Sequence, residues 1–175
     1  MSTLLDIART AGRFAWLEDR IADMTGAWVA TIDDSDARLV VGARSHTHAW
    51  HADLWRDRIP VVPGLDTSSF VAPARDELAR AIDQLADLET TLERMVALHR
   101  VLLPRLVTAY ALVLRGTNEL IDAPTVRTVR LVLEDTREET REGEIVIRSL
   151  GAETEADAAE GRLAAIIDSA GPLGG

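Results

Sequence analysis

Apolar residues recur every three or four positions through most of the chain, which is the spacing of one buried face of an α-helix. Four long helices are predicted, over residues 7–28, 36–58, 90–115 and 124–150. Strand patterns with paired hairpin turns are scarce. The expected buried stripes are Ile7, Thr10, Phe14, Leu17, Ile21, Met24 and Trp28; Val40, Ala43, Thr47, Trp50 and Leu54; Val96, His99, Leu103, Leu106, Tyr110 and Val113; and Val129, Val132, Thr136, Glu139, Gly143, Val146 and Leu150.

The connections between these helices are expected to be short, long and short. The long connection holds the irregular stretch PVVPGLDTSSFVAP at 60–73 and a predicted helix over 74–88. Thr90 and Glu93 have the spacing of a capping box, which starts the third long helix. It passes Pro104, which is expected to kink it. A short helix over 154–168 follows the fourth, so we expect a single domain over 1–170 and a flexible tail over 171–175.

Composition removes several classes of function. The chain has no cysteine and no lysine, so disulfides, thiolate chemistry and lysine Schiff bases are excluded. Its 29 acidic residues outnumber 19 arginines for a net charge of −10, which disfavours nucleic-acid binding. Apolar runs are shorter than the roughly 18 residues of a membrane-spanning helix. The first ten residues lack the pattern of a signal peptide. We therefore expect a soluble, cytoplasmic protein without a membrane partner.

The segment EDTREETREGE, at 134–144, resembles the last-helix signature of ferritin-like diiron proteins: Asp-Glu, two residues, His, three residues, Gly. Asp135 and Gly143 match this signature, whereas Thr136 stands where Glu is usual and Glu139 where His is usual. The stretch RSHTHAWHADLW, at 44–55, is similar to the second helices of ferritin-like proteins of unassigned function. The resemblance implies an all-α, ferritin-like four-helix bundle with a long, helix-containing crossover between helices 2 and 3 and a short C-terminal helix. The implied metal-ligand set is degenerate.

A diiron centre needs about four carboxylates and two histidines facing inward. The expected inward faces provide Glu139 and, at the edge of the first stripe, Glu18. His99 and Glu139 lie on two consecutive helices, and their distances along the helix axes from the connection between those helices differ by only about 3 Å. A polar core layer of His99, Glu139, Thr47 and Thr136 is therefore predicted, with Tyr110 near it. A buried carboxylate needs a partner, so His99 as imidazolium or an arginine is expected beside Glu139.

Three histidines lie on the predicted second helix. His46 and His51 are expected on opposite flanks of the buried face, and His48 on the far side with Trp55. The three therefore do not converge from this helix alone. His48 and His51, three residues apart, form a spacing that can chelate one metal ion if a neighbouring helix adds carboxylates.

The favoured interpretation is a non-catalytic ferritin-like scaffold or interaction protein that has lost the diiron site, with no catalytic residue and no cofactor. It predicts a homodimer or another protein partner, with exposed Trp16 or Trp55 as anchors. An alternative is an iron- or manganese-dependent oxidoreductase or metal binder that uses Glu18, His51, His99 and Glu139. A further alternative is a small-molecule carrier with an apolar pocket between the helices.

Overall fold

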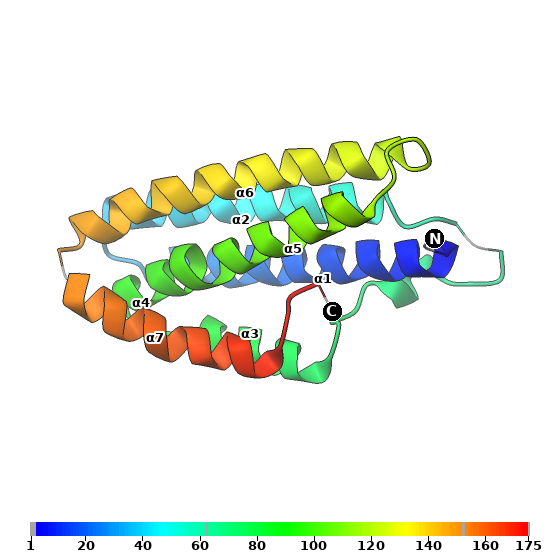
Figure 1. Ribbon diagram of the computed structural model, residues 1–175. Coiled ribbons are helices and arrows are strands. Elements are labelled where there is room, and N and C mark those ends of the chain that lie inside the picture. Colours follow the sequence, from blue (N-terminus) through cyan, green and yellow to red (C-terminus); the bar gives the residue numbers. More distant parts are fainter. Residues whose placement is uncertain (1–2, 62, 152, 175) are drawn as a thin grey trace.

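The computed structural model describes residues 3–61, 63–151 and 153–174, and every regular element among them is helical (Figure 1). The predicted all-α class is confirmed. α4, the π-helical η2 and α5 form one continuous helix, so the described residues contain six helices and a short 3₁₀ turn, with no strand. The elements are α1 (Leu4–Val29), α2 (Ser35–Arg56), η1 (Thr67–Phe70), α3 (Asp76–Ala86), α4 (Thr91–Val96), η2 (Ala97–Leu102), α5 (Leu103–Gly116), α6 (Ala123–Ser149) and α7 (Glu153–Ala170).

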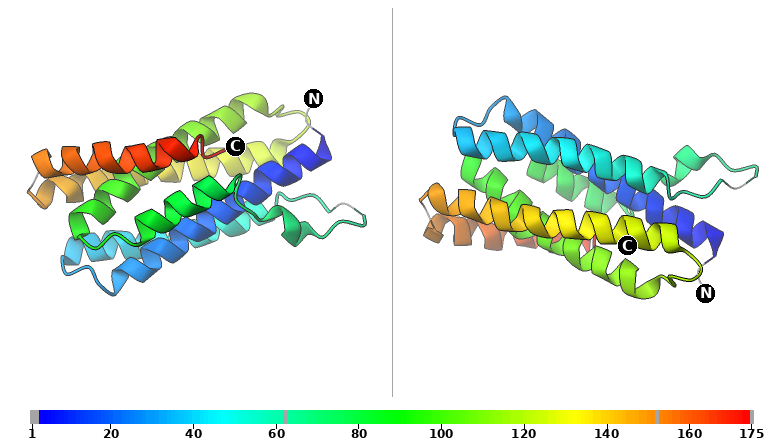
Figure 2. Two further views of the ribbon diagram at one scale, coloured as in Figure 1. Left: turned by 90° about the horizontal axis from the view of Figure 1, so that it is seen from below. Right: turned by 90° about the horizontal axis from the view of Figure 1, so that it is seen from above.

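Four long helices lie side by side in an elongated bundle (Figures 1 and 2). α2 packs against α1 and α6, and α5 packs against α6. The long connection between α2 and α4 carries η1 and α3. α3 and α7 pack together along one side of the bundle, where α7 covers η2 and α4. The predicted order of short, long and short connections is therefore present.

The third long helix begins as its sequence predicts, and its regular winding is interrupted just before Pro104. Thr90 caps α4 by accepting a hydrogen bond from the backbone N–H of Glu93, and its hydroxyl donates to the Glu93 carboxylate at 2.9 Å. The π-helical turn η2 lies directly before Pro104. Proline has no N–H to donate, and its ring crowds the carbonyl four residues earlier, so a widened turn relieves both problems. This turn carries His99 into the core.

The helix from Thr91 to Gly116 is long and apolar enough, by length and composition alone, to cross a membrane. It is the one such helix among the described residues. Within the bundle, 56% of its most apolar window is buried. A central helix that packs against its neighbours passes the same test, so the expectation of no membrane-spanning helix stays a prediction.

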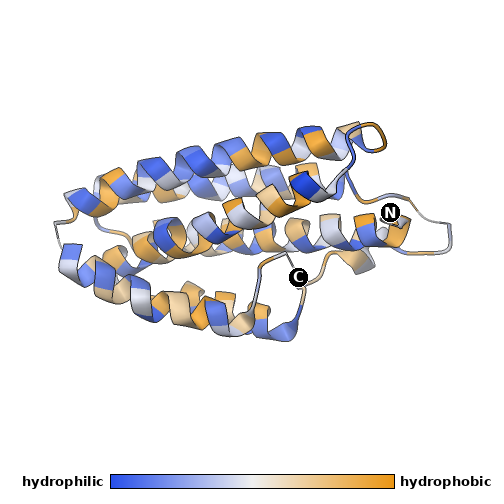
Figure 3. Ribbon diagram, in the orientation of Figure 1, coloured by the Kyte–Doolittle hydropathy of each residue, from blue (hydrophilic) through white to orange (hydrophobic). Residues whose placement is uncertain are grey.

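Three of the four predicted buried faces are confirmed. Along α1, α4–α5 and α6, most of the expected stripe residues are buried, including the polar His99, Thr136 and Glu139. Figure 3 shows hydrophilic residues prevailing along the middle of α6, as its many charged residues require. The core is therefore built from the residues whose helical spacing is most regular.

The predicted buried face of α2 is wrong by about one residue, or about 100° of rotation. Trp50 is 46% exposed and Thr47 is half-buried, whereas His48 and Trp55 are completely buried. The apolar residues of this helix are spread around its circumference, and two of its core positions are histidines. Burial also rules out Trp55 as an exposed anchor for a partner. The residues that α2 buries are Ala37, Val41, His48, His51, Ala52 and Trp55.

The end of the chain returns to the bundle. Leu173, within the segment predicted to be a flexible tail, is buried. The Arg75 guanidinium, before α3, donates to the backbone carbonyls of Ala170 and Pro172. Residue 175 of the predicted tail lies outside the described residues.

Candidate metal centre

Three completely buried side chains form a cluster between the first two helices. Glu18 comes from α1, and His48 and His51 come from successive turns of α2. Each offers one ligand atom, and these atoms all lie within 4.8 Å of one another. Residues three apart on a helix share one face, so the HxxH spacing of α2 directs both imidazoles towards α1.

Each of the two histidines lies between Glu18 and a carboxylate of α6. His48 bonds through Nδ1 to Glu18 Oε2, and its Nε2 lies 3.2 Å from Glu139 Oε2. His51 places Nδ1 3.6 Å from Glu18 Oε1, and its Nε2 bonds to Asp135 Oδ2 at 3.0 Å. Both Nδ1 atoms therefore face the same carboxylate, and both Nε2 atoms face a second one.

An aromatic wall closes one side of the cluster. The Tyr110 hydroxyl donates to Glu18 Oε1. Trp55 donates its Nε1–H to the Tyr110 oxygen at 3.3 Å. The Phe14 ring stacks on Trp55 with centroids 4.8 Å apart. Glu18 thus accepts a hydrogen bond from this aromatic side of the cluster in addition to its contacts with the two histidines.

Besides His48, the cationic partner of Glu139 is Arg44 of α2 rather than a protonated His99. Arg44 donates from Nη1 to Glu139 Oε1 at 3.1 Å and from Nη2 to Glu142. His99 shares the layer with Glu139, as predicted, but its Nδ1 lies 3.1 Å from the Glu139 backbone carbonyl and so carries the proton. The ion pair of His99 with the Glu139 side chain, one of two expected arrangements, is therefore not formed.

The two threonines of the predicted polar layer do not join the cluster. Thr136 is buried, but its hydroxyl donates to the Val132 carbonyl of its own helix at 2.6 Å. Thr47 is half-buried and likewise donates to Ala43, at 3.1 Å. Hydroxyls bonded in this way are satisfied within the helix, so they leave the cluster to carboxylates and imidazoles.

Opposite charges inside the cluster offset the free-energy cost of burying ionised groups. Burial alone raises the pKa of Glu18, but the charge and hydrogen bond of His48, with further contacts from His51, lower it to about 2. Burial alone lowers the pKa of His48, but the charge of Glu18 and the contacts with Glu139 raise it to about 10. Glu18 is therefore a carboxylate and His48 an imidazolium at neutral pH when no other cation is present.

Burial and neighbouring charges also shift the pKa values of the groups around Glu18 and His48. Burial opposes the charged form of His51, but its contacts with Glu18 and Asp135 raise its pKa above the ordinary value. Burial likewise opposes ionisation of Glu139, but His48 and then Arg44 lower its pKa. His99 differs, because burial and the charge of Arg44 lower its pKa to about 3, so it is neutral. Burial and the Glu18 charge raise the pKa of Tyr110 well above 10, which keeps its proton in place.

Several ring and carboxylate atoms of this layer are buried without a hydrogen-bond partner among the described residues. They are His48 Nε2, His51 Nδ1, His99 Nε2 and Glu139 Oε2. His48 Nε2 and Glu139 Oε2 are close enough for an ion pair but are not aligned for a hydrogen bond. Native proteins seldom leave such atoms unsatisfied, and a bound ion or water is the usual explanation. The layer therefore has free ligand capacity.

Comparisons with protein-family models, curated proteins and solved structures find no match to this chain. What the site can do therefore rests on its own geometry. Of the candidate ligands named from sequence, Glu18 and His51 are in the cluster, while His99 and Glu139 lie in the adjoining layer. Sequence reasoning missed the burial of His48 and the role of Arg44. The signal for His48 was its three-residue spacing from His51.

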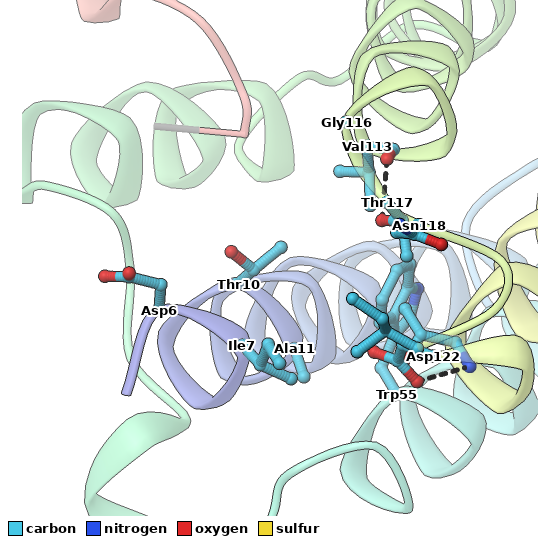
Figure 4. A pocket seen from close by; sticks show the side chains of 12 residues that line it. Asp6, Ile7, Thr10, Ala11, Trp55, Val113, Gly116, Thr117, Asn118 and Asp122 are labelled. Atoms are coloured by element: carbon cyan, nitrogen blue, oxygen red, sulfur yellow. Dashed lines mark hydrogen bonds between the residues drawn. The ribbon is translucent and has the colours of Figure 1, made fainter. Parts of the chain in front are cut away.

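A separate cavity of about 360 Å³ lies at the end of the bundle where α1 begins and α5 ends (Figure 4). Its lining includes the apolar Ile7, Val113 and Trp55 and the acidic Asp6 and Asp122. Trp55 connects the two features, because its ring lines the cavity while its N–H bonds to Tyr110 beside Glu18.

Proposed function

We propose that the protein binds one divalent transition-metal ion through Glu18, His48 and His51. The observation that carries this proposal is the convergence of three completely buried ligand groups to within 4.8 Å. Two imidazoles and one carboxylate suit zinc, iron or manganese, and three protein ligands leave a position open on the ion. A dication there would replace the protons that the two histidines now share with Glu18.

The surroundings of the two histidines support the same proposal. In metal sites, the ring nitrogen that does not bind the ion is commonly held by a carboxylate, which fixes the ring and strengthens the ligand. With both Nδ1 atoms on the ion, Nε2–H of His48 would point to Glu139 and Nε2–H of His51 to Asp135. The bond of His51 Nε2 to Asp135 at 3.0 Å already has this arrangement, and His48 Nε2 lies 3.2 Å from Glu139 Oε2, within reach of it.

This proposal revises the interpretation that the sequence favoured, a scaffold without a metal site. It keeps Glu18 and His51 of the alternative ligand set and adds His48. It moves Glu139 to a supporting role and leaves His99 as a neutral neighbour. A ferritin-like arrangement of the bundle remains part of the proposal, supported by four long helices and a helix-bearing crossover between α2 and α4.

Metal content tests the proposal directly. The protein would be purified without a polyhistidine tag from cells supplied with iron, manganese and zinc, and metal would be measured by mass spectrometry. We expect about one ion per chain, lost in a His48→Ala/His51→Ala variant. His46→Ala is the matched control, because His46 is an exposed histidine of the same helix. Wild-type protein with well below one ion per chain, or an unchanged double variant, would contradict the proposal.

A small-molecule carrier is a second candidate, favoured by the cavity beside Trp55 (Figure 4). Cavities of this volume hold small organic ligands. A Val113→Phe variant would narrow it without adding charge. Compounds that raise the wild-type melting temperature but not that of this variant would identify cavity ligands. An equal shift in both proteins would place binding elsewhere.

Self-association and a cytoplasmic location stay proposals. Leu120 and Ile121, in the connection between α5 and α6, are 97% and 73% exposed and are better candidate anchors than the buried Trp55. A homodimer formed there should dissociate in a Leu120→Asp/Ile121→Asp variant, as measured by light scattering. An unchanged mass would show that this connection is no anchor.

A further inference from the structure

A groove of about 300 Å³ opens between α2 and α6, beside the cluster. Its wall includes Glu139 and Asp135, the two carboxylates that face the Nε2 atoms of His48 and His51. Glu138 and Glu142 lie nearer the solvent along the same helix. The groove thus leads from an exposed acidic surface to groups that contact the proposed ligands.

One arginine of this groove pairs with both a buried and an exposed carboxylate of its wall. The Arg44 side chain is only 11% exposed and bonds to Glu139, which is 2% exposed, and to Glu142, which is 46% exposed. Its guanidinium therefore lies across the passage from the outer carboxylate to the inner one. Glu139 Oε2 lies 3.2 Å from His48 Nε2, so the inner carboxylate of the groove also faces a proposed metal ligand.

We propose that this groove is the access route for the metal ion and that Arg44 is its gate. The proposal rests on the metal site proposed above. Four carboxylates concentrate cations in the groove, because clefts lined by one sign of charge focus the field. Arg44 repels a dication at the neck until its guanidinium leaves Glu139. It can swing outward while it remains paired with Glu142, so opening breaks one ion pair rather than two.

A gate affects the rates of metal uptake and release differently from a positive charge that only weakens metal binding. If Arg44 only weakened binding by its charge, its removal would speed uptake and slow release. If it blocks the passage, its removal speeds both. Arg44→Met, similar in length and uncharged, should therefore raise uptake and release on the order of tenfold. Arg44→Lys keeps the charge but cannot bridge two carboxylates, so it should also speed release.

Uptake would be followed by stopped-flow with Co²⁺, whose visible absorption reports nitrogen and oxygen ligands, and release by excess chelator. Arg141→Met is the matched control, because it makes the same charge change on an exposed part of α6. Glu138→Gln should slow uptake about threefold through its weaker field. Glu134→Gln, on the same helix but outside the groove, should leave the rate unchanged.

The two proposals fail in different ways. If Co²⁺ and Zn²⁺ do not bind wild-type protein at equilibrium, the metal site itself is wrong. If they bind but Arg44→Met and Arg44→Lys release at the wild-type rate or more slowly, the site stands and the gate is wrong. If either folded Arg44 variant releases faster while Arg141→Met does not, the gate is supported.

Discussion

Gly143 on α6 lies directly against the imidazole of His99, so that a Cβ on Gly143 would stand 1.9 Å from His99 Cγ. No real Cβ makes so close a contact, and both residues are buried in the core. The glycine therefore provides the space in which His99 reaches the Glu139 carbonyl. This relationship explains physically why glycine occupies a position in the middle of a long helix, where it is otherwise unfavourable.

Gly143→Ala should therefore destabilise the protein by about 2 kcal/mol, because His99 must move within a packed core. Gly161→Ala is the matched control, since Gly161 lies in the middle of α7 with nothing near its Cβ position. That control should stabilise the protein by about 0.5–1 kcal/mol. Urea unfolding of the two variants measures both effects. A loss below about 0.5 kcal/mol for Gly143→Ala would contradict the close contact.

Helical spacing predicted the buried faces of α1, α4–α5 and α6 because large apolar residues such as Phe14, Leu17 and Ile21 mark those faces unambiguously. It failed for α2. There the core positions include His48 and His51, which a hydrophobic pattern reads as surface, while Trp50 lies outside. A helix that places polar groups in the core cannot be oriented from its apolar residues alone.

The residues of the candidate site were likewise predicted only in part. Glu18, His99 and Glu139 were found because they lie on or beside faces that the apolar residues had already defined. His48 was missed because the predicted rotation of α2 was wrong, although its three-residue spacing from His51 was visible. The bond of Arg44 to Glu139 joins residues 95 apart in the chain, and no local pattern reports such a contact.

The Glu18–His48 pair should make the metal-free protein sensitive to alkali. His48 has its pKa raised from 6.5 to about 10, so its contribution to stability is complete below pH 6.5 and is lost as the pH rises towards 10. His51 acts in the same direction. Because the chain has no lysine or cysteine, few other groups titrate between pH 7 and 9. The free energy of unfolding should therefore fall by about 1 kcal/mol per pH unit in that range.

His48→Gln should reduce this slope to less than half, whereas His46→Gln should leave it unchanged. Urea unfolding in the presence of a chelator, repeated from pH 7 to pH 9, measures the slope. Should His48→Gln not fold, His51→Gln provides the same test with a smaller expected change. Equal slopes in wild type and both core variants would show that neither histidine keeps its proton in the folded state.

Tyr110→Phe should cost about 2 kcal/mol of stability although the ring remains. The change removes the donor to the Glu18 carboxylate and leaves the Trp55 N–H without its acceptor, both in the core. Thr108→Ala, an exposed position on the same helix, should change stability by less than about 0.5 kcal/mol. Thermal unfolding compares the two. Equal effects would mean that the Tyr110 hydroxyl contributes nothing to holding Glu18.

Asp135→Asn should weaken metal binding by about 10- to 100-fold without removing a proposed ligand. Asp135 holds Nε2 of His51 at 3.0 Å, and a carboxylate in this position orients the ring and strengthens its other nitrogen as a ligand. Asparagine keeps the size but loses the charge. The loss should appear mainly as faster release of Co²⁺ to a chelator, since the ligand bond itself is weakened. Glu134→Gln, which removes the same charge one residue earlier on α6, should release the ion at the wild-type rate. If both variants release it equally, Asp135 acts only through the general field of the acidic surface and does not position His51.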